Sequence, residues 1–342
     1  LPPPTGRYNV GVRKYRLSHT TENDPFAPNN VSSSILLTFY YPTQARSRGP
    51  IPALEKPLAD IFEEGFVFAP GTLANITSNF IYDAPFLPES AGTAENPTIF
   101  FGPGGGGPPT PVYQTSLGEL ASHWYNVIGI DHPYEQQYIK YPDGEEVFGI
   151  PITYDLLPVV NQMYAFRLTD TTAVLDALPA IVQELGAAFN TTHFAGYGHS
   201  LGGAAAVGSA QIDERIVGAI NMDGSFWGDL ASTNETLADV KKPSFLLGFE
   251  FHMSAVDATW SSFPHAQSGW WREFLVQGSL HWDFSDGTFW KELGPHRSRS
   301  LGPINGERMV KIVRAFVTAF FDKLIGDAEP LLENPGRKWP EV

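Results

Sequence analysis

The pentapeptide at 198–202, Gly-His-Ser-Leu-Gly, is the segment of this chain that most directly indicates a chemistry. The apolar run at 192–197 predicts a short buried strand, and the small residues at 203–210 predict a helix packed tightly on a sheet. A G-x-S-x-G sequence between a strand and a helix is typical of a nucleophile elbow, where a sharp turn holds the serine above the sheet. We therefore interpret Ser200 as a nucleophile rather than as a helix-capping serine.

An activated serine needs a general base, and histidine is the usual one. The chain has nine histidines, and His281 is the one after Ser200 that lies in a dense polar and aromatic segment, 278–286. His252, by contrast, follows a predicted strand at once. We predict that His281 is the base.

The base in turn needs a carboxylate to orient it, and two candidates follow Ser200 in the chain. Asp223 directly follows the predicted strand 216–222 and precedes a glycine, so its side chain can be aimed at the carboxyl edge of the sheet. Glu250 ends the next predicted strand, 244–249, and is the rival. We favour Asp223.

Acyl transfer also needs N–H donors for the developing oxyanion. The backbone N–H of Leu201, next after the serine, is the first predicted donor. The second is expected from the glycine-rich loop after the predicted strand 98–101, where we choose Gly105, with Gly104 and Gly106 as close alternatives. We do not interpret this loop as a phosphate-binding loop, because the Gly-Lys-Ser/Thr ending of a P-loop is missing.

Composition excludes several classes of protein. The chain of 342 residues is 42% hydrophobic and 17% charged, as a folded domain is, and it has no run of about 18 apolar residues that could span a membrane. A net charge of −15 argues against nucleic-acid partners. The absence of cysteine and of paired histidine motifs predicts neither metal nor cofactor, and the isolated Asp131-His132 pair is interpreted as structural.

Four N-x-Ser/Thr sequons and a first residue, Leu1, that is not methionine favour a secreted, extracellular glycoprotein. The predicted glycosylation sites are Asn30, Asn75, Asn190 and Asn234. The oligomeric state is not indicated.

Strands and helices are predicted to alternate along most of the chain, which implies a mostly parallel sheet covered by helices on both faces. The expected strands are 9–17, 34–41, 98–101, 126–130, 192–197, 216–222 and 244–249. The expected helices are 112–123, 156–186, 203–210, 268–277 and 305–325. We predict a single domain over 1–342, with an irregular surface excursion at 43–95 and a tail at 327–342.

Taken together, these motifs resemble the plasma-type platelet-activating-factor acetylhydrolases, especially their secreted fungal relatives, within the α/β-hydrolase superfamily. The resemblance rests on the segments 100–106, 120–133, 198–203, 221–224 and 278–286. It implies an α/β-hydrolase fold, Asp223 rather than Glu250 as the acid, and a cofactor-free serine esterase that cleaves short acyl esters such as sn-2 acetyl phospholipids, in transient contact with a lipid interface.

Two other functions stay open. Pro103 stands where that family often has histidine or serine, and related polyester hydrolases also have proline there, so a polyester or general short-chain carboxylesterase is the first alternative. A catalytically silent binding protein is the second. The walls of the substrate pocket are predicted to include four aromatic residues, Phe226, Trp227, Trp260 and Trp282.

Overall fold

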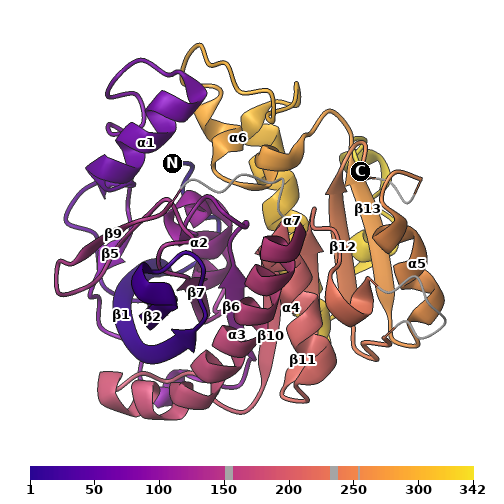
Figure 1. Ribbon diagram of the computed structural model, residues 1–342, viewed down its shortest axis with the longest axis horizontal. Coiled ribbons are helices and arrows are strands. Elements are labelled where there is room, and N and C mark those ends of the chain that lie inside the picture. Colours follow the sequence, from indigo (N-terminus) through magenta and orange to yellow (C-terminus); the bar gives the residue numbers. More distant parts are fainter. Residues whose placement is uncertain (151–156, 232–237, 253–254) are drawn as a thin grey trace.

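A twisted sheet of nine strands forms the centre of the computed structural model, which describes residues 1–150, 157–231, 238–252 and 255–342 (Figure 1). The strand order is β13-β12-β11-β10-β6-β7-β2-β1-β5. The strands are β1 (Asn9–Glu22), β2 (Val31–Thr43), β5 (Ile81–Tyr82), β6 (Thr98–Gly102), β7 (Val127–Asp131), β10 (Phe194–His199), β11 (Ile216–Met222), β12 (Ser244–Phe249) and β13 (Trp271–Val276). Two short antiparallel pairs lie outside it, β3 (Ile51–Pro52) with β4 (Thr77–Ser78), and β8 (Tyr138–Lys140) with β9 (Glu146–Phe148).

The six strands from β13 to β7 run parallel, and β2 is antiparallel to both of its neighbours. Parallel strands buried on both faces read as apolar runs, which is why the sequence predicts them well. The predicted α/β architecture, a mostly parallel sheet with helices on both faces, is confirmed. The strand that carries the elbow, β10, lies between β6 and β11 in the middle of the sheet.

Helices cover both faces of the sheet and define two apolar cores. One core joins the sheet to α1 (Lys56–Phe66), α2 (Gln114–Ser122) and α7 (Gly306–Leu324), and the other joins it to α3 (Leu157–Leu185), α4 (Leu201–Ile212) and α5 (Ala258–Ala266). A short helix, α6 (Gly287–Trp290), precedes α7. Among the described residues, no helix is long and apolar enough to cross a membrane.

The predicted helix at 268–277 is wrong, because this segment forms the edge strand β13. Its residues, Trp-Arg-Glu-Phe-Leu-Val, are mostly aromatic or aliphatic types that favour strands, and they pair in parallel register with β12. Five of the six side chains are only half-buried, as at a sheet edge. The segment therefore lacks the alternation of apolar and polar residues that identifies a strand in a sequence.

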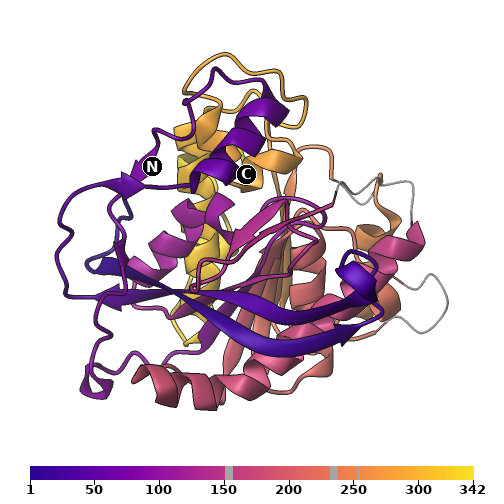
Figure 2. The ribbon, with the colours of Figure 1, turned by 60° about the vertical axis from the view of Figure 1, so that its left-hand side comes forward.

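The segment 43–95 is more than a surface excursion. Its helix α1 buries Leu58, Phe62 and Phe66 in a main core and lies beside α6 in both ribbon views, where Phe62 contacts Trp290 with ring centroids 5.4 Å apart (Figure 2). The tail at 327–342 also packs on the fold, since Trp339 makes an edge-to-face contact with Phe316 of α7. Both segments lack long periodic patterns, which hid their packing in the sequence.

Candidate active site

Ser200 occupies the sharp turn between β10 and α4. Its backbone has φ 56° and ψ −127°, a conformation that a residue with a side chain rarely adopts and that costs free energy. A Cβ atom on Gly202 would overlap the carbonyl oxygen of Gly102, and one on Gly198 would overlap Gly202, so the two glycines of the motif are required by close backbone contact. The Ser200 N–H donates to the carbonyl of Met222 at 2.7 Å, which fixes the turn against β11.

The structure brings His281 to Asp223. The imidazole follows β13 at the start of a single 3-10 turn (His281–Phe284), and its Nδ1–H donates to Oδ2 of Asp223, which follows β11. Because Nδ1 carries the proton in this pairing, Nε2 is left with its lone pair. Ser200 and His281 line the same two clefts, as a nucleophile and its general base must.

Asp223 is held by more than one donor. Its side chain is fully buried, and Oδ1 accepts the Phe249 N–H at 2.9 Å and His252 Nδ1 at 2.8 Å. Burial by itself would raise the pKa of this carboxyl, but the hydrogen bonds from His252 and His281 outweigh burial and hold the pKa below its usual value. Asp223 is therefore ionised throughout the physiological pH range.

Glu250, the rival acid, has another partner. Its Oε2 accepts the N–H of Gly278 at 2.9 Å, in the loop that leads to His281. Its carboxylate therefore supports the backbone that carries the histidine, while Asp223 contacts the imidazole itself.

A chain of hydrogen bonds links the glycine-rich loop to the histidine loop. The Gly104 N–H donates to the Tyr113 hydroxyl at 3.2 Å, and that hydroxyl lies 2.9 Å from His199 Nδ1. The other ring nitrogen, Nε2, lies 2.8 Å from the His281 carbonyl, so Nε2 carries the proton and Nδ1 accepts from Tyr113. Burial, with the nearby charge of His281, lowers the pKa of His199 to about 3, and the ring is neutral.

A buried ion pair supports the same loop from below. The guanidinium of Arg167, on α3, donates to the carbonyls of Pro103 and Gly104 and to the carboxylate of Glu135. Glu135 in turn accepts the Gly106 N–H at 3.2 Å. This pair could not be predicted from the sequence, because the two residues are 32 positions apart, one in a loop and one on a long helix.

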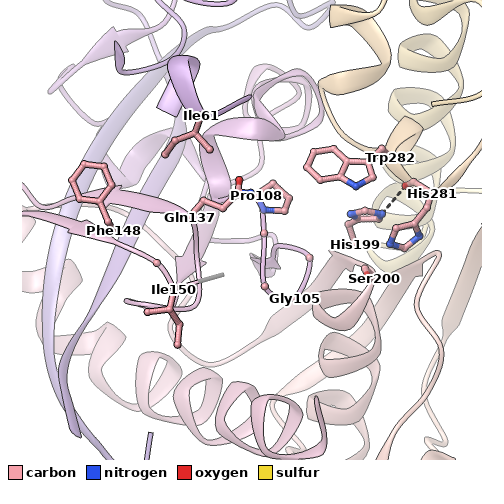
Figure 3. Close-up of a pocket in the computed structure, with 14 residues that line it drawn as sticks. Ile61, Gly105, Pro108, Gln137, Phe148, Ile150, His199, Ser200, His281 and Trp282 are labelled. Carbon is pink, nitrogen blue, oxygen red and sulfur yellow. Dashed lines mark hydrogen bonds between the residues drawn. The ribbon is translucent and has the colours of Figure 1, made fainter. Parts of the chain in front are cut away.

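Two clefts meet at Ser200. The first has a volume of about 580 Å³ and lies between the glycine-rich loop, α1, the β8–β9 pair and Trp282, as Figure 3 shows. Its lining residues are Ile61, Gly104, Gly105, Gly106, Gly107, Pro108, Gln137, Phe148, Gly149, Ile150, His199, Ser200, His281 and Trp282. The second, of about 400 Å³, opens toward α3. It is lined by Gly105, Val160, Met163, Ser200, Leu201, Asp223, Ser225, Trp227, Phe249, His252 and His281.

Of the four predicted pocket aromatics, Trp282 lines the first cleft and Trp227 the second. Phe226 and Trp260 lie in the core instead. Phe226 stacks on Phe263 with centroids 4.5 Å apart, and Trp260 is fully buried with its indole N–H on the carbonyl of Gly224. Both rings are buried, and a sequence does not distinguish a buried core aromatic from one that lines a pocket.

Ligand-type atoms of His199, Asp223 and His281 all lie within 4.8 Å of one another. Both nitrogens of His199 and the Nδ1 of His281 are engaged in hydrogen bonds, so the arrangement is one of proton donors and acceptors rather than of open ligands. The Asp131-His132 dipeptide is buried, but the two do not share a partner. Asp131 accepts from Thr110, and His132 Nδ1 lies 2.7 Å from Asp170.

The predicted glycosylation sites differ in exposure. Asn30 and Asn75 are exposed, and Asn190 is half-buried with its amide oxygen accepting three hydrogen bonds from Thr192 and His193. Asn234 lies outside the described residues.

Comparison with solved structures decides the fold. A ferulic acid esterase from Streptomyces cinnamoneus superimposes with a TM-score of 0.83 at 26% sequence identity, over 99% of this chain and 97% of that one. The chain has the α/β-hydrolase fold. In this α/β-hydrolase, Ser200 lies on the strand-to-helix elbow and Asp223 and His281 follow it in the order that the fold uses.

A sequence relative agrees with the resemblance predicted from the motifs. A probable 1-alkyl-2-acetylglycerophosphocholine esterase of Arthroderma benhamiae is 30% identical over 271 residues, covering 72% of this chain. The alignment spans 65% of that relative's own length. No protein-family model matches the chain.

Proposed function

We propose that this α/β-hydrolase cleaves carboxylic esters through an acyl-enzyme formed on Ser200. The observation that carries the proposal is the His281–Asp223 hydrogen bond beside a serine held at φ 56° where two clefts meet. The two esterases among its relatives support the same reaction class. A binding protein without activity does not need a strained serine, an oriented imidazole and a buried carboxylate in one place.

In this mechanism Ser200 Oγ attacks the ester carbonyl while its proton passes to His281 Nε2. The imidazolium, stabilised by Asp223, then protonates the leaving alkoxide as the C–O bond breaks. Water, deprotonated by the same imidazole, attacks the acyl-enzyme. The bond between the acyl carbon and Ser200 Oγ breaks, the acid leaves, and the imidazolium returns its proton to Oγ. The reaction needs no metal and no cofactor.

The N–H groups of Leu201 and Gly105 are the proposed oxyanion donors. Leu201 is the first residue of α4, where backbone N–H groups have no partner within the helix and the helix dipole favours negative charge. Gly105 lines both clefts together with Ser200, where a donor to the oxyanion is needed.

We propose short acyl esters as substrates, with sn-2 acetyl phospholipids as the first to test because of the name of the sequence relative. Two clefts that diverge from one serine suit an ester, whose acyl and alcohol parts lie on opposite sides of the carbonyl. Polyesters and general short-chain esters are the alternative, and hydroxycinnamoyl esters follow from the name of the structural neighbour.

The test is a panel of p-nitrophenyl esters from C2 to C12, a phospholipid with an sn-2 acetyl group and a feruloyl ester. We expect turnover that is highest for the shortest acyl chains and that falls by about 10⁴-fold or more in S200A. An S200A variant as active as the wild type would contradict the proposal. The ratio of kcat/KM between the phospholipid and the simple esters decides the substrate class.

We also propose that the protein is a secreted glycoprotein in transient contact with lipid surfaces. The exposed positions of Asn30 and Asn75 support glycan attachment there. Protein made in a eukaryotic secretory host should lose mass on treatment with an endoglycosidase, and N30Q with N75Q should reduce that change.

A further inference from the structure

The triad carboxylate serves two histidines, and only one of them is explained by the proposed mechanism. His252 lies three residues beyond β12, is buried, and lines the second cleft together with Ser200 and Asp223. Its Nδ1 lies 2.8 Å from Asp223 Oδ1, and its Nε2 lies 2.9 Å from Asp257 Oδ2. The ring stacks on the indole of Trp260, with centroids 4.1 Å apart.

This geometry fixes the protonation state of His252. A neutral imidazole has one N–H and one lone pair, and a lone pair 2.8–2.9 Å from a carboxylate oxygen would be repelled. Two carboxylates, one at each ring nitrogen, therefore require N–H on both, which is the imidazolium. Burial would lower the pKa of His252, but the hydrogen bonds that the ring donates to both carboxylates outweigh burial and raise the pKa to about 9.

In a proposal that rests on the proposed function, we propose that His252, as an imidazolium, is a positioning residue that holds Asp223 and whose positive charge extends the activity of the enzyme to lower pH. In the row Asp257–His252–Asp223 the charges are negative, positive and negative, and the neutral imidazole of His281 contacts the last of them. Asp223 alone would favour the protonated form of His281, which cannot act as a base. The cation on the other oxygen of Asp223 opposes this effect, so the active form persists into mildly acidic solution.

The surroundings of His252 support a built site rather than a chance contact. Asp257 is the N-cap of α5, where it accepts the Thr259 N–H and hydroxyl, and it also receives the hydroxyl of Ser225. Within the described part of the chain, the titratable groups that face His252 are Asp223 after β11, Asp257 before α5 and Glu273 on β13. Burial raises the pKa of Glu273, and the positive charge of His252 opposes that rise.

Three variants separate this electrostatic role from a structural one. H252Q keeps an amide donor for Asp223 but removes the cation. The acid limb of the pH profile, which is the pH range where kcat/KM falls on acidification, should therefore shift to higher pH by about one unit. D257N removes a negative charge and should move the limb down. The double variant H252Q/D257N restores the net charge of the row, and its limb should return to within about half a unit of the wild type.

The measurement is kcat/KM on a soluble acetyl ester from pH 4 to 9, with H265Q as the matched control because His265 is exposed on α5. The order D257N, wild type, H252Q in rising acid-limb pH supports the proposal. Acid limbs that stay together, or a double variant that shifts further than H252Q, overturn it. If H252Q does not fold, D257N against the wild type decides: a limb that fails to move down overturns the proposal.

Failure of this inference differs from failure of the proposed function. If the protein does not hydrolyse esters through Ser200, the wild type shows no activity that S200A abolishes. If only the role assigned to His252 is wrong, the wild type is active and S200A is inactive, but the acid limbs of the variants do not separate.

Discussion

At the scale of single residues, Asp223 connects the imidazole of His281 to the rest of the fold. Its two oxygens accept from His281, from His252 and from the Phe249 N–H, so its orientation is fixed by three independent elements. A carboxylate held in this way sets the imidazole tautomer before substrate arrives and needs no rearrangement during the reaction.

Replacing Asp223 with Asn should lower kcat by about 10⁴-fold, because an amide favours the wrong imidazole tautomer and cannot stabilise the imidazolium. Glu250 is the matched control, since it is also a carboxylate at the end of a neighbouring strand. E250Q can still accept the Gly278 N–H and should retain activity within about tenfold. Steady-state kinetics on a soluble ester checks both variants, and a larger loss in E250Q than in D223N would place the acid on the later strand.

Ser200 and Asp223 could be proposed from the sequence because each follows a predicted strand, and His281 because it lies in a polar and aromatic segment. The supporting residues were beyond its reach. Arg167, Tyr113 and His252 act through partners far away in the chain, and no spacing rule connects them. The aromatic residues around the site show the same limit, since Trp227 and Trp282 line clefts while Phe226 and Trp260 are core.

At the scale of elements, the glycine-rich loop after β6 is held between two buried supports. On one side the Tyr113 hydroxyl accepts the Gly104 N–H. On the other side Arg167 donates to neighbouring carbonyls, and Glu135 accepts the Gly106 N–H. Preorganised donors stabilise an oxyanion only when they do not have to move, so these supports should matter for kcat more than for KM.

R167M should therefore lower kcat by about 10- to 100-fold with a smaller change in KM, and it should also destabilise the fold because Glu135 is left buried without its partner. R314M is the control. Arg314 is another buried arginine, which donates to the carbonyls of Pro2, Pro3 and Thr115, away from the loop. Steady-state kinetics at temperatures below the unfolding transition of both variants tests whether R167M loses more kcat than R314M. Equal losses of kcat in the two would show that only global stability is involved.

Elements with strong periodic signals were predicted to within a few residues, and elements stabilised by packing were not. The long helices α3 and α7 carry apolar faces that the sequence displays. The edge strand β13 is six residues long and half-buried, so its apolar run fits a helix as well as a strand. Helix α1 is surrounded by proline-rich loops, which hid an apolar face that the fold buries.

At the scale of the whole molecule, stability depends on buried acids as well as on the two cores. Asp131 is fully buried at the end of β7, with one oxygen bonded to Thr110 and the other without a partner among the described residues. Burial raises the pKa of this carboxyl to about 6, although the hydrogen bonds from Thr110 oppose the rise.

The sign of the pH effect follows from that direction. A raised folded-state pKa means that Asp131 contributes its full stability below the unfolded value of about 3.9, and that this contribution is lost as pH rises through about 6. D131N, which stays neutral, should match the wild type near pH 4 and exceed it by up to about 3 kcal/mol at pH 8. Urea unfolding at several pH values checks this.

Glu214 provides the control for this stability comparison, because its side chain is 95% exposed. E214Q should differ from the wild type by the same small amount at each pH. A D131N variant whose stability difference from the wild type does not change between pH 4 and pH 8 would contradict the assignment of a raised pKa to Asp131.

The central claim is that Ser200 is the nucleophile, and covalent labelling with a fluorophosphonate tests it most directly. We predict one phosphonyl group per chain by intact mass, located on the peptide that contains Ser200, with ester hydrolysis lost in proportion to labelling and no adduct in S200A. An adduct on a different serine that accompanies the loss of activity, or full activity after complete labelling of Ser200, would contradict the account.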